Sequence, residues 1–330
     1  MKRRIVLFTA LLLIVSSVFM SCGEDNPKKQ LPAESGITSK DVTLDDSSIT
    51  SEDFTHDDED VTLDDSSTDE TSSIEQKGLF IDENAFPDDM FRVCVTEQAD
   101  SDKDGYLSYY EINASLDLAI GYNLPEGQNI DSLKGIENFK NLQELSLNGV
   151  NIESLDLSEF KNLTNLSIHD TPLKQLVLSK DVLRTLYISN APLKSLDVSG
   201  SANLRELTCE QAKLEILNIS DCIHLQRLYL SDNRIKSLDL SNFKFLSYVD
   251  CQGNEMESLI TTGCDSLETL FCENNNLTEL EVNHLKNLKT LGVAFNPLTV
   301  LDVSKLEGLK LHYGMGYDEY KIIGEYTYIE

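Results

Sequence analysis

Residues 142–163 read Leu142-Gln-Glu-Leu-Ser-Leu-Asn-Gly-Val-Asn-Ile-Glu-Ser-Leu-Asp-Leu-Ser-Glu-Phe-Lys-Asn-Leu163, and this frame returns through most of the remaining chain. Its first leucine recurs at Leu163, Leu183, Leu204, Leu225, Leu246, Leu267, Leu288 and Leu309. The step is 21 residues each time except from Leu163 to Leu183, where it is 20. A fixed period of this kind predicts a solenoid, in which each repeat stacks on the next.

Apolar residues occupy the same places in every repeat when the first leucine is counted as position 1. Positions 4 and 6 alternate with outward positions 3 and 5, as in a β-strand, and positions 14 and 16 repeat the alternation. Each turn should therefore carry two short strands, one on either side of a flat coil. Equivalent strands of successive turns should stack in parallel. One repeat buries too few side chains to fold alone, so stacking must complete the core. We predict eight repeats over residues 142–308 and a strand-rich C-terminal cap over 309–330.

The first residues predict export. Lys2, Arg3 and Arg4 precede an apolar run over residues 5–15, which is typical of a signal peptide, here 1–21. Cys22, directly after Ser21, resembles the acylated cysteine of the bacterial lipobox, although Phe19 stands where leucine is usual. An ordinary cleaved signal with an incidental cysteine is the alternative. Because glycine rather than aspartate follows Cys22, the resemblance implies anchoring to the outer membrane with surface exposure.

The chain is strongly acidic, with 57 acidic and 27 basic residues and a formal net charge of −30. Nucleic acids and anionic lipids both require basic side chains. We therefore expect no nucleic-acid partner, and membrane contact only through the lipid anchor. Residues 22–78 are rich in Asp, Glu, Ser and Thr and contain the octet Asp-Val-Thr-Leu-Asp-Asp-Ser-Ser twice, at 41–48 and 60–67. This composition predicts a disordered acidic linker.

A short stretch before the repeats predicts a calcium site. Residues 100–111 read Asp100-Ser-Asp-Lys-Asp-Gly-Tyr-Leu-Ser-Tyr-Tyr-Glu111, the spacing of an EF-hand loop. Hard Ca²⁺ takes six to eight oxygen ligands. The candidate ligands are the side chains of Asp100, Asp102, Asp104, Ser108 and Glu111 and the carbonyl of Tyr106.

This EF-hand-like module should span residues 79–121. A helix should enter the loop after Pro87, and a second should leave it through Ile112, Leu116 and Ala119 and end at Gly121. A lone loop favours a weak structural calcium site, which we expect to stiffen the joint between linker and solenoid. A metal-free acidic turn is the alternative, and the loop also resembles half of a dockerin module.

The frame L-x-x-L-x-L-x-x-N-x-L-x-x-L-D-L resembles leucine-rich repeats of the 21-residue bacterial class. Together with the signal, acidic linker and calcium loop, it resembles bacterial leucine-rich-repeat lipoproteins with internalin-like repeats, over about residues 79–308. Residues 122–141 should form the N-terminal cap. The family's asparagine at position 9 is kept by Asn233, Asn254, Asn275 and Asn296 but missing from the first four repeats, which we therefore expect to be less regular.

The resemblance implies that a partner binds the outer face of the first strand row. Exposed aromatic residues are frequent at interfaces, and ordinary surface packing is the alternative. The candidate partner-binding residues are Tyr187, Arg227, Tyr229, Tyr248, Asp250 and Phe271. The acids at position 15, including Asp156, Asp197 and Asp239, indicate a solvated stripe, with a ligand stripe as the alternative.

No enzymatic motif is present. None of the five histidines lies at a familiar spacing from a Ser or Cys nucleophile, and the cysteines of the repeats fill core positions, where we expect free thiols. The predicted function is that of a cell-surface or outer-membrane lipoprotein that binds a host or cell-surface protein through its repeat face. The alternatives are a glycan- or peptide-binding component and a scaffold within a surface complex.

Overall fold

The computed structural model describes residues 77–312 and 320–329, all within one of the two units of the chain, Thr71–Glu330. The signal peptide, Cys22 and all of the linker except residues 77 and 78 lie outside the described residues. The account below concerns this unit alone.

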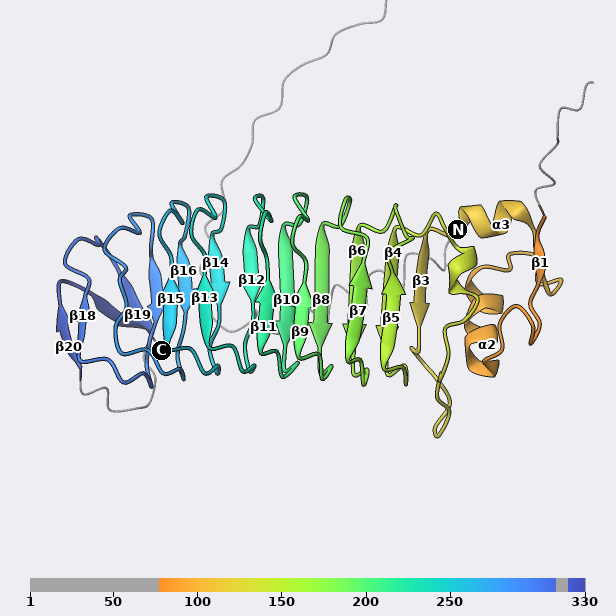
Figure 1. Ribbon diagram of the computed structural model, residues 1–330, viewed down its shortest axis with the longest axis horizontal. Coiled ribbons are helices and arrows are strands. Elements are labelled where there is room, and N and C mark those ends of the chain that lie inside the picture. Colours follow the sequence, from red (N-terminus) through yellow and green to blue (C-terminus); the bar gives the residue numbers. More distant parts are fainter. Residues whose placement is uncertain (1–76, 313–319, 330) are drawn as a thin grey trace, which may run out of the picture. The chain divides into compact units, whose positions relative to one another are not determined.

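The repeats form a coil whose first strand row is one parallel ladder of 11 strands (Figure 1). Each strand of the eight full repeats pairs with the same positions of the next, so that Leu145 is opposite Leu166 and Leu207 is opposite Leu228. The strand after the eighth repeat is shifted by one residue, with Lys310 at position 2 opposite Thr290 at position 3. The strands, in ladder order, are β3 (Asp117–Ile120), β4 (Glu144–Asn148), β6 (Asn165–His169), β8 (Thr185–Ser189), β10 (Glu206–Glu210), β12 (Arg227–Tyr229), β14 (Tyr248–Asp250), β16 (Thr269–Phe271), β17 (Thr290–Gly292), β19 (Lys310–His312) and β21 (Thr327–Ile329).

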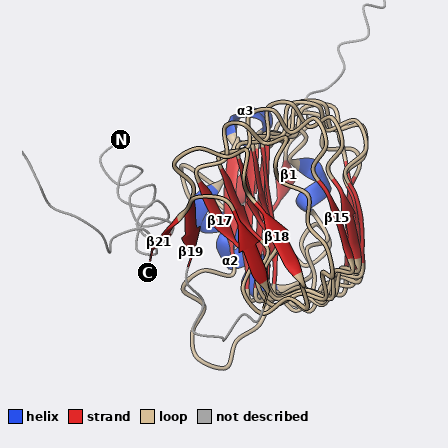
Figure 2. Cartoon of the chain, turned by 90° about the vertical axis from the view of Figure 1, so that its left-hand side faces the viewer, coloured by secondary structure: helices blue, strands red, loops and turns tan. Residues whose placement is uncertain are grey.

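A second strand row lies on the other side of the coil, as the end view in Figure 2 shows. It consists of separate parallel pairs: β5 (Ser154–Leu157) with β7 (Gln175–Leu178), β9 (Ser195–Asp197) with β11 (Ile216–Asn218), β13 (Ser237–Asp239) with β15 (Ser258–Ile260), and β18 (Val300–Asp302) with β20 (Lys321–Ile323). The expected fold is confirmed: a β-solenoid of about nine turns with parallel strands and few helices.

The interior is filled by the repeated leucines. Position 1 is buried in every turn, from Leu142 to Leu309, and positions 4 and 6 are buried along the whole first row. Residues at positions 1, 4 and 6 pack against residues at positions 11, 14 and 16, which come from the side of the second row. Each turn therefore covers the core of its neighbours. Burying a leucine contributes about 2 kcal/mol, which the stack repeats along its length.

The module before the repeats holds two helices, α2 (Asp89–Gln98) and α3 (Tyr109–Ala114), and the short pair β1 (Leu79–Phe80) and β2 (Tyr106–Leu107). The expectation that the second helix reaches Ala119 is wrong. The helix ends at Ala114, where the Ser115 hydroxyl donates to the Glu111 carbonyl over 2.8 Å. Residues 117–120 form β3, because Leu118 and Ile120 alternate into the solenoid core beside Leu145 and Leu147.

The outer edge of β3 is covered by a side chain of α2. The Gln98 amide donates to the Ala119 carbonyl and accepts from the Ala119 N–H, both over 2.8 Å. A side-chain amide thus takes the place of a neighbouring strand and protects a ladder edge. The cap that follows buries Ile130, Leu133 and Ile136 and contains the 3-10 helix η1 (Ile136–Asn138).

The first four repeats are regular, so the expectation that they are less regular is wrong. Their first-row strands, β4, β6, β8 and β10, have five residues each, whereas the strands of the four asparagine-bearing repeats have three. Where asparagine is absent, the backbone ladder continues through positions 6 and 7. Where it is present, as at Asn275, its side-chain nitrogen donates to the carbonyls of Cys251, Cys272 and Glu273 at 3.0–3.1 Å.

The described part of the tail continues the coil. β20 pairs with β18 and β21 pairs with β19, so residues 321–329 add one more pair of strands beyond the last full repeat. Tyr320 and Tyr326 pack against the core cluster from this end. Tyr313 and Tyr317 lie outside the described residues.

Candidate functional site: an acidic and aromatic patch on the first strand row

The first strand row has one outward face, made by positions 3, 5 and 7 of each repeat. The residues at position 5 align across the ladder because the pairing is in register from turn to turn. In order, they are Ser146, Ser167, Tyr187, Thr208, Tyr229, Asp250, Phe271 and Gly292. Three consecutive repeats, the fifth to the seventh, therefore place aromatic or acidic residues at position 5, namely Tyr229, Asp250 and Phe271.

Four rings form a continuous aromatic row along this face, consisting of Tyr229, Tyr248, Phe271 and His312. The ring centroids of Tyr229 and Tyr248 are 4.9 Å apart, and those of Tyr248 and Phe271 are 6.0 Å apart. Phe271 meets His312 edge-to-face at 5.5 Å. These are favourable separations for aromatic pairs, and each ring is partly exposed. The row extends over four strands, β12, β14, β16 and β19.

Tyr187 and Arg227 are not members of the aromatic row, although Arg227 lies opposite Tyr248 in the ladder. Tyr187 packs on the ring of His169, with centroids 4.6 Å apart, and Thr208 separates it from Tyr229 along the ladder. The exposed Arg227 pairs with Glu206, its Nη1 lying 3.5 Å from the Oε2 of that carboxylate. The structure therefore brings together Tyr229, Tyr248, Asp250 and Phe271 but leaves Tyr187 and Arg227 at the margin.

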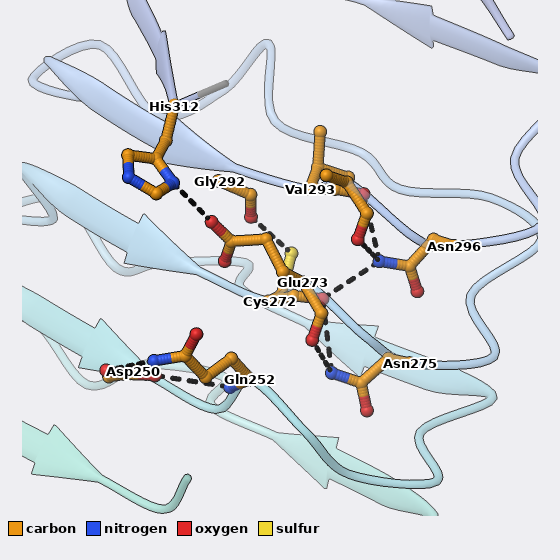
Figure 3. A network of polar contacts seen from close by, with 10 residues as sticks. Asp250, Gln252, Cys272, Glu273, Asn275, Gly292, Val293, Asn296 and His312 are labelled. Carbon is orange, nitrogen blue, oxygen red and sulfur yellow. Dashed lines mark hydrogen bonds and ion pairs between the residues drawn. The ribbon is translucent and has the colours of Figure 1, made fainter. Parts of the chain in front are cut away.

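Three carboxylates lie among these rings and form what we call the acidic group: Glu210, Asp250 and Glu273. Asp250 is 9% exposed and accepts from the backbone and side-chain nitrogens of Gln252, both over 3.2 Å. Glu273 is 5% exposed, and its Oε1 lies 3.0 Å from His312 Nδ1. Its other oxygen, Oε2, is buried without a hydrogen-bond partner. Figure 3 shows the Glu273 carboxylate directed at His312, with Asp250 on the neighbouring turn.

The position of Glu273 depends on the glycine of the next strand. A Cβ atom at Gly292 would lie 1.9 Å from Glu273 Oε1 and 2.3 Å from Cδ, so the carboxylate occupies the space where another residue would carry a side chain. Glycine inside a strand weakens it and often marks such a close approach. The backbone beneath is fixed as well, because the Asn275 side chain holds the Glu273 carbonyl.

The acidic group shifts the pKa values of its members. Burial, followed by the repulsion of Glu210 and Glu273, raises the pKa of Asp250 to about 6. Burial also raises the pKa of Glu273, against the opposing hydrogen bonds from its own N–H and His312. The pKa of Tyr248 is raised by burial and then by Asp250. Perturbed pKa values of this kind gather at functional sites.

Sequence reasoning missed Glu210, Glu273 and His312, because it considered only positions 3 and 5 as outward. Position 7 also faces outward, and Glu210 and Glu273 both occupy it. The signal available in the sequence was the glycine at position 5 of one repeat, in a column otherwise filled by residues with side chains. Nothing in the repeat pattern indicates that His312 approaches from another strand.

A serine–histidine contact lies elsewhere on the same face. His169 Nε2 is 2.8 Å from Ser167 Oγ, and its Nδ1 is 3.1 Å from Ser189 Oγ. The spacing of these three residues matches no familiar catalytic motif. Burial lowers the pKa of His169. Both ring nitrogens are engaged by hydroxyls, so no carboxylate orients the imidazole as a catalytic triad requires.

The predicted calcium ligands converge in part. One carboxylate oxygen each from Asp100, Asp102 and Asp104 lie within 4.8 Å of one another. Asp100 is buried and organises the loop, since its oxygens accept from the N–H groups of Lys103 at 2.6 Å and Gly105 at 3.0 Å. Gly105 has φ +81°, a value that glycine adopts without strain. An all-oxygen donor set of this kind fits Ca²⁺.

Glu111 is held next to this group rather than within it. Its Oε1 accepts from the N–H and hydroxyl of Ser101 at 2.7 and 2.6 Å, and its Oε2 accepts from the N–H and hydroxyl of Ser108 at 3.0 and 2.9 Å. The Ser101 hydroxyl is the main cause that lowers the pKa of Glu111 to about 2. The edge of the loop is paired with β1, Leu79 lying opposite Leu107 and Phe80 opposite Tyr106.

The acidic stripe of the second row has a structural role. The carboxylates of Asp156, Asp197, Asp239 and Asp302 each accept from the N–H of the serine two residues later, at 2.8–2.9 Å. These bonds close the turn after the strand. At Asp197, the hydroxyl and the N–H of Ser199 lower the pKa of the carboxyl to about 2. The position-15 acids are therefore engaged in turn formation.

The cysteines of the described residues are buried and free, as their core positions predict. They are Cys94, Cys209, Cys222, Cys251, Cys264 and Cys272. Burial raises the pKa of the Cys251 and Cys272 thiols well above its ordinary value, which keeps them protonated and unreactive. The Cys272 thiol donates to the Gly292 carbonyl over 3.2 Å beneath the acidic group.

Comparison with known proteins identifies the repeats. The family model described as Leucine Rich Repeat matches residues 224–264. These are leucine-rich repeats. The functional domain of InlJ from Listeria monocytogenes, whose description includes a cysteine ladder, shares 25% identity with a TM-score of 0.54. The match covers 76% of this chain and 61% of that domain, so the chain spans less than two thirds of its length.

Two further internalins of Listeria monocytogenes str. 4b F2365 share 18% identity. Internalin C2 has a TM-score of 0.42, with coverage of 77% of this chain and 98% of that chain. Internalin InlF has a TM-score of 0.31, with coverage of 78% and 95%. No curated protein matches the chain. Residues 224–264 thus match the leucine-rich-repeat family, and the fold is similar to that of the InlJ functional domain.

Over residues 77–312 and 320–329, no helix combines the length and apolar character needed to cross a membrane. The leucine-rich-repeat face described above, which carries the aromatic row and the acidic group, is the candidate site of interaction.

Because the pKa of Asp250 is raised, replacing its carboxyl by a neutral group should stabilise the folded chain by an amount that depends on pH. The folded chain holds the Asp250 proton up to about pH 6, and the unfolded chain only up to about 3.8, so this residue's contribution to stability falls as the pH rises between those values. Asp250→Asn should raise the free energy of unfolding relative to wild type at pH 7.5, by roughly 1–3 kcal/mol, and much less at pH 4.5.

Urea unfolding of both chains at the two pH values measures this difference. The control is Asp239→Asn. Hydrogen bonds from Ser241 lower the pKa of the Asp239 carboxyl, so this variant should be less stable than wild type at pH 7.5. An Asp250→Asn effect of equal size at both pH values would contradict the raised pKa.

Proposed function

We propose that this chain is a surface-exposed lipoprotein that binds a protein partner, from a host or from a neighbouring cell surface, through its leucine-rich-repeat face. The observation that carries the proposal is the aromatic row, Tyr229, Tyr248, Phe271 and His312, on the outward face of the ladder. Tyrosine and other large rings carry much of the binding energy at interfaces because they bury large area with few rotatable bonds.

The location in this proposal rests on the N-terminal sequence: three basic residues, an apolar run and Cys22 directly after Ser21. Several acyl chains on one cysteine anchor a protein firmly, since each buried CH₂ contributes about 0.8 kcal/mol. The anchor would leave the repeat face free to meet a partner outside the cell.

Cell fractionation tests the anchor. The wild-type chain should sediment with outer membranes and incorporate a fatty-acid label, whereas Cys22→Ala should remove the label and release the chain from the membrane fraction. Membrane association without any label, unchanged in the variant, would refute lipid anchoring at Cys22.

Partner binding depends on the aromatic row in this proposal. The Tyr229→Ala, Phe271→Ala double variant removes two of the four rings of the row, and binding to intact host cells or to a purified protein ligand should fall at least tenfold. Surface-binding measurements on the full-length chains measure the effect, and circular dichroism verifies the fold.

The matched control uses aromatic residues outside the row. Tyr110 and Phe245 are exposed, Tyr110 on α3 and Phe245 outside positions 3, 5 and 7. The Tyr110→Ala, Phe245→Ala chain should bind like wild type. Undiminished binding by the Tyr229→Ala, Phe271→Ala chain would exclude the row as the site, and retention of polysaccharide in place of protein would favour the glycan-binding alternative.

We also propose that the loop over residues 100–111 holds one structural calcium ion. Asp100, Asp102 and Asp104 would supply carboxylate oxygens, with the Tyr106 carbonyl and the Ser108 side chain beside them. Glu111 would complete the set by exchanging its serine hydrogen bonds for the metal. Support comes from the convergence of the three aspartates and from the pairing of β1 with β2, which secures the loop edge without a second loop.

Isothermal titration calorimetry of the full chain with CaCl₂ tests this site. We expect one binding event with a dissociation constant of about 10⁻⁴–10⁻³ M, lost in Asp100→Asn, Glu111→Gln. Asp117→Asn, an exposed aspartate on β3, is the control for the general effect of removing negative charge. Heat that persists in the double variant would assign calcium binding to acidic residues outside the loop.

A further inference from the structure

The acidic group is an arrangement that folding alone does not explain. Glu273 is 5% exposed, and its Oε2 has no hydrogen-bond partner. Leaving a buried polar atom unpaired costs about 1–3 kcal/mol, and more for a charged group. The neighbouring Asp250 is nearly as buried. Over residues 142–308, the other repeats carry no acidic residue at position 5 or 7, so the coil does not need carboxylates there.

The nearby charges do not neutralise the group. The charged residues that act on Asp250 are Glu210 and Glu273, both acidic. Glu273 has one cationic neighbour, His312, whose side chain is 40% exposed and engages only Oε1. The nearest arginine of the face, Arg227, is paired with Glu206. A site of concentrated negative potential therefore remains between β14 and β19.

Aromatic faces border this negative site. Tyr248 and Phe271 lie on the strands that precede Glu273, and the ring of His312 contacts Phe271. A ring face is negative, so a cation within about 6 Å of the ring centroid is attracted to it, by about 2 kcal/mol where water is excluded. Carboxylates and aromatic faces together select a positively charged group on an apolar stem, and they disfavour an anion.

We propose that the acidic group and the aromatic row together receive a lysine or arginine side chain of the protein partner, with the Glu273 carboxylate as its main counter-charge. This inference rests on the proposed function and specifies its ligand chemistry. Asp250 supplies the second negative charge, and Tyr248 and Phe271 contact the aliphatic stem. Gly292 contributes by leaving room for the Glu273 carboxylate.

The proposal accounts for the shifted protonation of the group. Without a cation, carboxylates that are buried next to one another retain a proton. A bound ammonium or guanidinium group supplies the positive charge instead and releases that proton. Binding should therefore strengthen as the pH rises through the pKa of Asp250, about 6. Glu210, Glu273, Tyr229, Tyr248 and His312 face the same site.

The experiment compares two defined peptides on the full-length chain. Acetyl-Gly-Lys-Gly-amide is the probe, and its norleucine analogue has the same stem length without the charge. Saturation-transfer NMR at pH 7.5 should show that the lysine peptide binds at least tenfold more tightly than the norleucine peptide, with the strongest transfer at the methylenes next to the ammonium. At pH 5 the lysine peptide should bind about tenfold more weakly.

Variants assign the binding to the acidic group. Glu273→Gln should weaken the lysine peptide about tenfold or more and leave the norleucine peptide unchanged, because a charge-assisted hydrogen bond is lost. Gly292→Ala keeps every charge but displaces the carboxylate, and it should weaken the lysine peptide as well. Glu279→Gln, in the same repeat but on an exposed site outside the group, is the control and should have no effect.

The outcomes separate this inference from the proposed function. Equal affinity for the two peptides, or equal weakening by Glu273→Gln and Glu279→Gln, overturns the inference, since the second result would show only attraction to an acidic protein. If Glu273→Gln weakens the peptide while the Tyr229→Ala, Phe271→Ala chain keeps its protein partner, the inference stands and the proposed protein-binding role of the row fails. If the aromatic variant loses the partner and the peptides do not differ, the reverse holds.

Discussion

In-register stacking of identical turns is the constraint on which the rest of the structure depends. One turn buries too little surface to offset the entropy of ordering its chain, so every leucine column must be shared with the turns on either side. The parallel ladder keeps that register, because a shift of one residue would turn the inward columns to solvent. The outward columns are consequently aligned as well, which places Tyr229, Asp250 and Phe271 in one line.

The two kinds of repeat solve the same hydrogen-bonding problem differently. In the first four, five-residue strands satisfy the backbone through positions 6 and 7. In the later ones, the asparagine at position 9 binds those carbonyls and the strand is shorter. The acidic and aromatic patch lies mainly over the asparagine-bearing repeats. There Asn275 and Asn296 hold the carbonyls of Cys272, Glu273 and Val293, so the turn beneath Glu273 is fixed by side chains as well as by the ladder.

A repeat fold lets one column vary without disturbing the core. Cysteine, isoleucine, leucine and valine replace one another inward, where only volume and polarity matter. Outward, Gly292 at position 5 admits a buried carboxylate, whose cost in stability is local. The residues of the proposed interaction site are thus departures from the repeat consensus on one face, whereas the Asp–Ser pairs of the opposite row follow the consensus and close turns.

The sequence by itself determined the coil, its two strand rows, the buried columns and four members of the patch, because a 21-residue period and an alternation of two residues translate directly into positions in space. It did not determine where the helix after the calcium loop ends, since Leu118 and Ile120 suit a helix or a strand until β4 is beside them. Only the tertiary structure decided that Glu273 lies across Gly292 and meets His312. That contact joins residues 39 positions apart on different turns, so no local sequence pattern indicates it.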